Sequence, residues 1–473
     1  MNWNDLLSTE KLMPEEAEPK QFAEYPINVF EKDYRKIVYS AAFRRLQDKT
    51  QVFPLDKSDF VRTRLTHSIE VSTIAKQLGI MAVKNIAKYH KNELSDEQAE
   101  VIPSILQCAG LLHDLGNPPF GHFGETTIGD WFRDNLKNID YHGRPVADLL
   151  AQQMYSDLSH FEGNAQALRI LLKSKHDSGV DVSEAIISTL VKYPVNSEHL
   201  AIQPKSHKKF GIYLADQELF AEISKIVGTV GSDGLICRHP LTYLLEAADD
   251  IAYATSDMED AYKKGLFTLD SFIDYFRSEC AKTASRKKYA MELIKDLEKK
   301  RGNVHTSDKD AKAFKEWLNC TRKWLMHAAV FGFSKNYDSI MKGLFNRDVF
   351  YETNHAVTLR ILKDAMGEFV FNSAGIIKLE LSAQVIIATL LNGFVRAVIH
   401  YGYEDEDAGY ALSKADKKYI NLLSQNYRDD YEKTKTGNEC TDLYLRLLMV
   451  VDYISGMTDT YARTLYRELI GVE

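Results

Sequence analysis

The stretch GLLHDLGNPPFGHFGE (110–125) places two histidines, an aspartate and a glutamate around a pair of prolines. The run that leads into it, SILQCAGLLHDLG (104–116), is almost entirely apolar and predicts a buried helix. A buried helix rarely carries an unpaired charge, because removing a carboxylate from water is costly. Either His113 and Asp114 are compensated by a bound ion, or the segment is not buried. The glycine and prolines that follow predict the end of the helix at this point.

The composition of the 473-residue chain favours an all-α fold. Its 25 glycines and 11 prolines amount to about 8% of the residues, below the roughly 12% that is usual, and 45% of the residues are hydrophobic. Sheet-rich folds need more turn residues than this. We therefore expect helices throughout and at most a small β-hairpin, for which AIQPKSHKKFGIYLAD (201–216) is the candidate.

Helical periodicity recurs along the whole chain, in the segments 29–46, 64–90, 183–193, 240–265 and 440–470. A charge-rich region from about 267 to 320 predicts two solvated helices joined by a loop near 301–303. No repeat or sharp domain boundary is evident. We therefore treat 1–473 as a single extended domain, with a metal-site core at 30–265 and a carboxy-terminal helical region at 266–473.

Charge and cysteine usage limit the class of protein. With 59 basic and 67 acidic residues the net charge is −8, so a phosphorylated ligand requires a local basic pocket or a metal ion. The five cysteines are far apart and favour reduced thiols in a cytoplasmic protein. The acidic amino terminus does not have the layout of a secretory signal. The apolar run 385–399 is interrupted by Asn392 and Arg396, which predicts a core helix and no membrane association.

Four side chains in three separate apolar segments are candidate ligands of one metal ion. His67 lies in RTRLTHSIEV, His113 and Asp114 in LLHDLG, and Asp249 in LLEAADDIAY. A divalent transition ion accepts imidazole nitrogen and carboxylate oxygen together, and two of each leave positions open for water and substrate. From the residues alone, ordinary core histidines and an isolated His-Asp pair remain the alternative.

The motifs, taken in order, resemble the HD-domain deoxynucleoside triphosphate triphosphohydrolases, and most closely the bacterial deoxyguanosine triphosphatases. The likeness runs from THSIEV through GLLHDLGNPPFGHFGE, HFEGNAQALR (160–169), KYP (192–194) and EAADDIAYATSDMED (246–260) to SGMTDTYARTLYREL (455–469). It implies an HD-domain helical fold and hydrolysis of a deoxynucleoside triphosphate, such as dGTP, to the deoxynucleoside and inorganic triphosphate. It also implies that His67, His113, Asp114 and Asp249 hold one divalent ion, whose identity (Mg, Mn, Fe, Co, Ni or Zn) stays open.

The resemblance also implies roles for residues around the metal. His122 is expected to act as the general acid, with Glu125 three residues later orienting and charging its imidazole. Asp249 is preferred to Asp250 because Tyr253 and Asp257 then follow on one helical stripe. The substrate-binding residues expected from the family pattern are Gln51, Arg64, Asn164, Lys192, Tyr193, Tyr253 and Asp257, with Arg62 a weaker candidate.

Two alternative functions remain open at this point. An HD phosphodiesterase or nucleotidase would use the same His…His-Asp…Asp ligands on another phosphoester, and a catalytically inert nucleotide-sensing protein would keep the fold alone. The family resemblance further implies a homo-oligomer, tetramer or hexamer, and an effector deoxynucleotide. Basic residues near Lys205–Lys209 and Arg286–Lys288 suggest accessory binding of single-stranded DNA.

Overall fold

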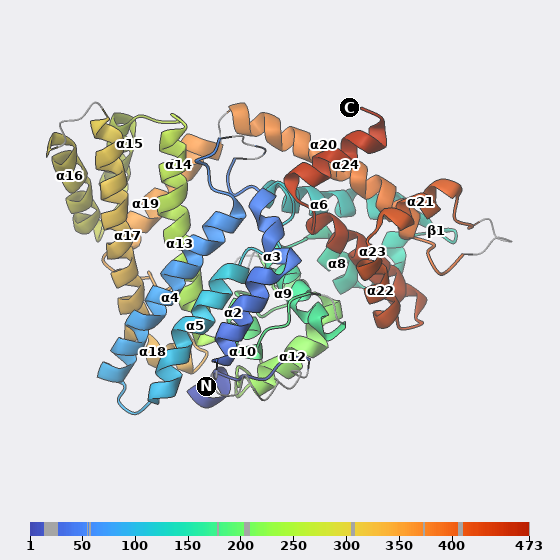
Figure 1. Ribbon diagram of the computed structural model, residues 1–473, viewed down its shortest axis with the longest axis horizontal. Coiled ribbons are helices and arrows are strands. Elements are labelled where there is room, and N and C mark those ends of the chain that lie inside the picture. The colour runs from blue at the N-terminus through green and yellow to red at the C-terminus, as the bar shows by residue number, and fades with distance from the viewer. Residues whose placement is uncertain are drawn as a thin grey trace.

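The computed structural model is almost entirely helical (Figure 1). It describes residues 1–13, 27–53, 55, 58–176, 179–202, 209–303, 308–371, 374–404 and 410–472. The first helices are α1 (Trp3–Leu6), α2 (Val29–Tyr39), α3 (Ala41–Arg45), α4 (Arg64–Tyr89), α5 (Asp96–Leu112), α6 (Gly121–Asn135), α7 (Val146–Leu149), α8 (Gln152–Ser159), α9 (Gly163–Leu172), α10 (Glu184–Leu190), α11 (Glu198–Ile202), α12 (Gln217–Ile226) and α13 (Pro240–Ala252).

The later helices are α14 (Met258–Lys263), α15 (Leu269–Lys282), α16 (Lys287–Asn303), α17 (Lys309–Lys335), α18 (Tyr337–Met341), α19 (Ala356–Met366), α20 (Ala374–Val398), α21 (Lys414–Leu422), α22 (Gln425–Thr434), α23 (Glu439–Ser455) and α24 (Asp459–Ile470). Short 3-10 turns are η2 (Leu46–Asp48), η3 (Leu136–Asn138), η4 (Lys173–His176) and η5 (Leu214–Asp216), and π-helical turns are η6 (Tyr253–Asp257) and η7 (Gly367–Phe371). The predicted all-α class is confirmed.

The small sheet in the described residues is a hairpin, but at a different place from the predicted one. Strands β1 (Asp140–Tyr141) and β2 (Arg144–Pro145) pair antiparallel, with Tyr141 opposite Arg144. The two residues between them both have positive φ, as tight hairpin turns require. Of the segment 201–216, residues 203–208 lie outside the described residues, and the part from 209 onward contains the turn η5.

Several predicted helices are broken by caps that apolar periodicity does not reveal. The segment 29–46 divides at Ser40, whose hydroxyl accepts a hydrogen bond from the backbone N–H of Phe43 and so begins α3. The segment 440–470 divides in the same way, because Thr458 accepts a hydrogen bond from the N–H of Tyr461 at the start of α24. The segment 64–90 forms α4 almost as expected, with a capping box between Thr63 and Thr66.

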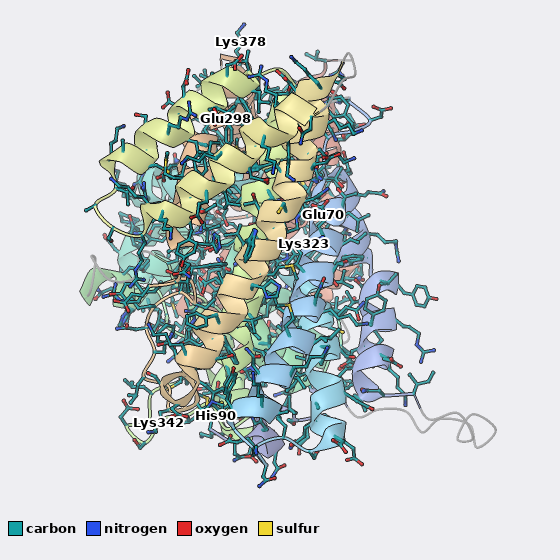
Figure 2. All side chains as sticks on the ribbon, turned by 90° about the vertical axis from the view of Figure 1, so that its left-hand side faces the viewer. Glu70, His90, Glu298, Lys323, Lys342 and Lys378 are labelled. Carbon is teal, nitrogen blue, oxygen red and sulfur yellow. The ribbon has the colours of Figure 1, made fainter. Side chains whose placement is uncertain are left out.

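The charge-rich region contains three helices, not the two solvated helices that were predicted. Helices α15, α16 and α17 carry charged side chains on their outer faces, among them Glu298 and Lys323 (Figure 2). Each also buries an apolar stripe, and the buried residues include Phe272 and Trp317. The break predicted near 301–303 coincides with the end of α16. The prediction missed the third helix because surface charges mask the buried stripes.

Two large hydrophobic clusters form the interior. The first packs α4 and α5 with α2, α10, α13, α15, α16, α17 and α19. The second packs α6 and α8 with α20 and α23, so helices close to the HD dipeptide share a core with the carboxy-terminal helices. Figure 1 shows α20 running across the top of the molecule into this second group. The division at residues 265 and 266 stays a prediction.

One helical stretch, Ile376–Val398 within α20, is long and apolar enough to cross a membrane by length and composition alone. Half of its most apolar window is buried within the structure. The apolar side chains of its second half, among them Leu390 and Phe394, pack in the second cluster, whereas Asn392 and Arg396 are exposed. The packing of this half agrees with the core helix expected from the sequence.

A buried ion pair joins α9 to α23 and should contribute strongly to stability. The guanidinium of Arg169 lies 2.9 Å from Asp452, and both side chains are less than 10% exposed. Removing one partner of such a pair leaves an uncompensated buried charge, which costs about 3–5 kcal/mol. Asp452→Ala should therefore lower the free energy of unfolding, measured by urea denaturation, by that amount. Asp429→Ala, at an exposed position, should change it by no more than about 0.5 kcal/mol; equal effects would contradict the prediction.

Candidate metal centre and active site

The close packing of α4 against α5 brings two histidines together. His67 lies in the first turns of α4, and His113 caps the end of α5. Gly110 permits this approach, because a Cβ at that position would lie 2.5 Å from the Cα of Ser72. The two imidazole rings consequently lie with their centroids 5.3 Å apart.

Two carboxylates complete a cluster with the geometry of a metal site. The ligand atoms of His67, His113 and Asp114 all lie within 4.8 Å of one another. Oδ1 of Asp249 lies 3.3 Å from Nε2 of His67 and 3.5 Å from Nε2 of His113. Ligand atoms held about 2.1 Å from one ion are separated by roughly 3.0–3.5 Å. These residues could therefore hold a divalent metal ion.

The hydrogen bonds of His113 leave one ring nitrogen available to a metal ion. Its Nδ1 donates to the carbonyl oxygen of Gly110 at 2.9 Å, so Nε2 is the nitrogen directed into the cluster. This buried Nε2 has no hydrogen-bond partner among the described residues, and it faces Asp114 at 3.5 Å and Asp249 at 3.5 Å. A metal ion between Nε2 and the two carboxylates would be a partner for all three groups.

Both carboxylates are ionised at neutral pH, as metal binding requires. Burial raises the pKa of Asp114, but the charges of His113 and Arg64 outweigh it and lower the pKa to about 2. Burial likewise opposes ionisation of Asp249, yet Lys192 and His113 hold the pKa of that carboxyl well below its usual range. Asp114 also accepts a hydrogen bond of 2.5 Å from the side chain of Asn117.

The second aspartate of the pair points away from this cluster. Asp250 forms an ion pair of 2.6 Å with Lys363 of α19, and burial raises its pKa to about 6. The structure therefore brings Asp249, and not Asp250, beside both histidines.

His122 and Glu125 form a hydrogen-bonded pair at the start of α6. The chain enters the helix with positive φ at Phe120 (64°) and Gly121 (63°), and the first turn packs closely against the prolines, because a Cβ at Gly124 would lie 2.1 Å from the carbonyl oxygen of Pro119. Nδ1 of His122 donates to Oε2 of Glu125 at 2.6 Å. The other oxygen of Glu125 accepts the backbone N–H of Gly163 at 2.8 Å, so the carboxylate is fixed from two sides.

The environments of these two side chains differ in a way that suits proton transfer. The imidazole of His122 is 80% exposed, whereas Glu125 is only 8% exposed. The hydrogen bond to Glu125 raises the pKa of His122 above its ordinary value. Burial opposes ionisation of Glu125, but its bond to His122 and the charge of Lys209 outweigh burial and lower its pKa.

The predicted phosphate-contact residues lie at the edge of the metal cluster. Arg64 forms an ion pair of 2.7 Å with Asp114, and Lys192 forms one of 2.8 Å with Asp249. Tyr193 follows Lys192, and burial raises its pKa. Asn164, at the start of α9, donates a hydrogen bond of 2.5 Å from its side chain to Glu162. Burial raises the pKa of Glu162, and the charge of Glu125 raises it further.

The predicted sugar-contact residues lie around a π-helical turn. Helix α13 changes to the π-helix η6 at Tyr253, so the regular α-helical stripe expected from Asp249 to Asp257 is widened by one residue. Asp257 is fully buried, its oxygens lack hydrogen-bond partners, and burial raises its pKa to about 7. The charge of His67 and, to a smaller extent, the nearby side chain of Gln51 lower this pKa. Burial raises the pKa of Tyr253, and the negative charge of Asp257 raises it further.

Two basic residues lie differently from what the sequence predicts. Arg62 is held by Glu70, Glu259 and Asp260, so its charge is compensated within the protein. Lys209, expected in a DNA-binding patch, lies 3.3 Å from Glu162 and influences the pKa of both Glu125 and His122. No spacing motif points to Lys209, because a tertiary contact alone brings it near His122 and Glu125.

Known proteins are similar in sequence to this chain over all or nearly all of its length. Residues 64–216 match the HD domain, and residues 410–468 match the phosphohydrolase-associated domain. The deoxyguanosinetriphosphate triphosphohydrolase-like protein of Listeria monocytogenes is 41% identical, and that of Synechocystis is 32% identical, each over the full length of both chains. The deoxyguanosinetriphosphate triphosphohydrolase of Yersinia enterocolitica is 33% identical over 95% of both chains. The chain therefore belongs to the HD-domain family that contains the deoxyguanosinetriphosphate triphosphohydrolases.

Proposed function

We propose that this protein is a metal-dependent enzyme that hydrolyses a deoxynucleoside triphosphate, with dGTP as the first candidate, to the deoxynucleoside and inorganic triphosphate. The observation that carries this proposal is that a cluster of possible metal ligands and a hydrogen-bonded proton donor lie close together along the chain. A cluster suited to a divalent ion ends at Asp114, and a hydrogen-bonded acid pair, His122 and Glu125, begins eight residues later. The names of the relatives support the same substrate class.

The residues divide the chemistry between them. His67, His113, Asp114 and Asp249 would hold a divalent ion, which would supply polarisation of the phosphoryl group and of water. Arg64, Lys192 and Tyr193 bind the triphosphate, and Asn164 lines the same side of the site. Gln51, Tyr253 and Asp257 hold the sugar.

The reaction exchanges one bond for another. The oxygen of water forms a bond to the α-phosphorus, and the bond between that phosphorus and the 5′ oxygen breaks. His122, protonated while it is bonded to Glu125, gives its proton to the leaving 5′ oxygen. The proton that the attacking water loses passes to solvent, from which His122 is protonated again. The products are a neutral deoxynucleoside and intact triphosphate.

Product analysis tests this function against the other phosphoester reactions of HD proteins. Hydrolysis of dGTP in H₂¹⁸O should place one ¹⁸O in inorganic triphosphate and none in deoxyguanosine, as measured by mass spectrometry. Release of orthophosphate or pyrophosphate would support an HD phosphodiesterase or nucleotidase instead. Absence of turnover with all four deoxynucleotides, singly and in pairs, and with Mg²⁺, Mn²⁺, Fe²⁺, Co²⁺, Ni²⁺ or Zn²⁺, would support an inert nucleotide-sensing protein. Turnover only in mixtures would identify an effector deoxynucleotide.

We also infer a cytoplasmic homo-oligomer, a tetramer or hexamer. The exposed side chains of Ile377, Leu381 and Val385 recur every four residues on the first half of α20 and form one apolar stripe. A second copy of the chain is the occupant we propose for it. Leu381→Glu should lower the mass measured by light scattering after size exclusion, whereas Glu380→Gln should leave it unchanged. The same mass for both variants would exclude this stripe as the interface.

Accessory binding of single-stranded DNA is proposed at Arg286–Lys288, which are exposed at the start of α16. Lys205–Lys208, the other basic residues expected to take part, lie outside the described residues. A gel shift that weakens as salt rises would support this binding, and unchanged mobility at low salt would remove it.

A further inference from the structure

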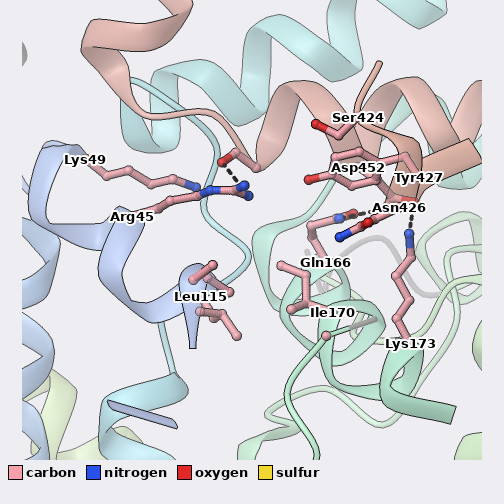
Figure 3. Close-up of a pocket in the computed structure, with 14 residues that line it drawn as sticks. Arg45, Lys49, Leu115, Gln166, Ile170, Lys173, Ser424, Asn426, Tyr427 and Asp452 are labelled. Atoms are coloured by element: carbon pink, nitrogen blue, oxygen red, sulfur yellow. Dashed lines mark hydrogen bonds and ion pairs between the residues drawn. The ribbon is translucent and has the colours of Figure 1, made fainter. Parts of the chain in front are cut away.

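A cavity of about 310 Å³ lies between α3, α9, α22 and the turn that joins α23 to α24 (Figure 3). None of the residues proposed for the active site lines it. Its volume falls at the lower end of the range for small-molecule sites, about 300–1,000 Å³. Its lining combines cationic, polar and apolar side chains with one carboxylate, that of Asp452, whose charge Arg169 and Lys173 compensate. It is therefore neither a packing defect of the core nor a surface depression without chemistry.

Two cations at one end of the cavity lack anionic partners. Lys49 is 3% exposed, and its Nζ donates to the carbonyl oxygens of Asn117 at 2.6 Å and Ser455 at 2.7 Å. Arg45 contacts only the carbonyl of Gly456, at 3.5 Å. Within the part of the chain that the structure describes, neither forms an ion pair. Figure 3 shows the charged ends of both side chains directed to the same side of the cavity.

The third cation of the cavity is in a different situation. Lys173 forms ion pairs with Asp430 at 2.9 Å and Asp452 at 2.6 Å, so its charge is compensated by the protein. Arg45 and Lys49 are therefore the basic side chains of the cavity that form no ion pair with a described residue. Burial, with the charge of Arg64, lowers the pKa of Lys49 to about 7, and a phosphate beside its ammonium group would favour the charged form.

The rest of the lining suits the organic part of a ligand. Leu115 and Ile170 present apolar surface, and Tyr427 presents an aromatic ring, with the ammonium of Lys173 5.5 Å from its centre. We propose that this cavity is a second ligand site, which binds a small phosphorylated molecule with its phosphate between Arg45 and Lys49 and its organic part against Tyr427. A phosphate dianion matches two cations, and the guanidinium fork bonds two of its oxygens at once.

The site shares one side chain with the active-site turn. Lys49 donates to the backbone carbonyl of Asn117, and the side chain of Asn117 donates to Asp114. Lys49 therefore contacts both the cavity and the turn that presents the proposed metal ligand. The cavity is therefore linked to the proposed active site through Lys49, but it is a separate site.

Calorimetric titration of the full-length protein with inorganic phosphate tests the proposal. Arg45→Gln removes one cation, and Ser424→Asp adds a negative charge to the cavity wall. Ser424 is exposed at the N-cap of α22, where aspartate is an equally good cap, so this variant should fold normally. Each variant should weaken phosphate binding at least tenfold. Arg44→Gln, at an exposed neighbouring position outside the cavity, should bind like the wild type.

Other outcomes would overturn the proposal. Absence of phosphate binding by the wild type, or binding unaffected by both Arg45→Gln and Ser424→Asp, would exclude the site. Binding lost in Lys192→Met and retained in Arg45→Gln would assign the phosphate to the active site instead. Adenosine monophosphate should bind more tightly than phosphate in a manner sensitive to Arg45→Gln. Equal affinities would refute the assignment of the organic part to Tyr427.

Discussion

Asp249→Asn should release the metal ion and abolish turnover, whereas Asp250→Asn should preserve both. The two residues are adjacent on α13, and each forms an ion pair with one lysine. Only Asp249 lies between the two histidines, at 3.3 and 3.5 Å from their Nε2 atoms. Asparagine keeps the shape of the side chain but removes the charge that a divalent ion requires of its oxygen ligands.

The measurement is metal content by mass spectrometry after loading with Mn²⁺ and desalting, together with turnover of dGTP. His113→Ala and Asp114→Ala should give the same double loss as Asp249→Asn. Asp250→Asn is a matched control because it also leaves a lysine, Lys363, without its partner. Full metal content in Asp249→Asn would remove this residue from the proposed ligand set, and loss of metal in both variants would indicate a general structural effect.

The sequence predicts the parts of this structure that depend on local chemistry. Long apolar periodicity with a good cap predicts α4 to within one residue. The choice of Asp249 over Asp250 follows from helical spacing, and the structure places the two residues accordingly, although their roles stay a prediction. The His122–Glu125 contact follows from residues three apart in the first turn of a helix.

Features that depend on tertiary contacts could not be predicted in the same way. The π-helical turn at Tyr253 changes the helical spacing without any glycine or proline to announce it. Arg62 resembles a free phosphate-binding cation in sequence, yet carboxylates from two other segments neutralise it. Lys209 reaches the catalytic pair from a basic run that composition alone assigns to the surface. In each case, segments distant in sequence determine the environment of the side chain.

His122→Ala should reduce turnover by about 10²–10⁴-fold while the metal content and the thermal midpoint remain those of the wild type. The expected loss follows from the role of general acid, because the leaving 5′ oxygen then departs without a proton from the protein. The imidazole is 80% exposed and contributes little packing, so its removal should not disturb the fold. Turnover equal to that of the wild type would refute the acid role.

Glu125→Gln tests whether Glu125 stabilises the protonated form of His122 or only positions its imidazole ring. Glutamine can still accept a hydrogen bond from Nδ1 of His122, but it cannot stabilise the imidazolium by charge. Since Glu125 raises the pKa of His122, the protonated acid persists to higher pH in the wild type, and turnover falls as pH rises through that pKa. The variant should therefore lose turnover more mildly than His122→Ala, and the alkaline limb of its pH–rate profile should move to lower pH. A loss of rate with an unmoved alkaline limb would mean that Glu125 orients the imidazole without tuning its proton.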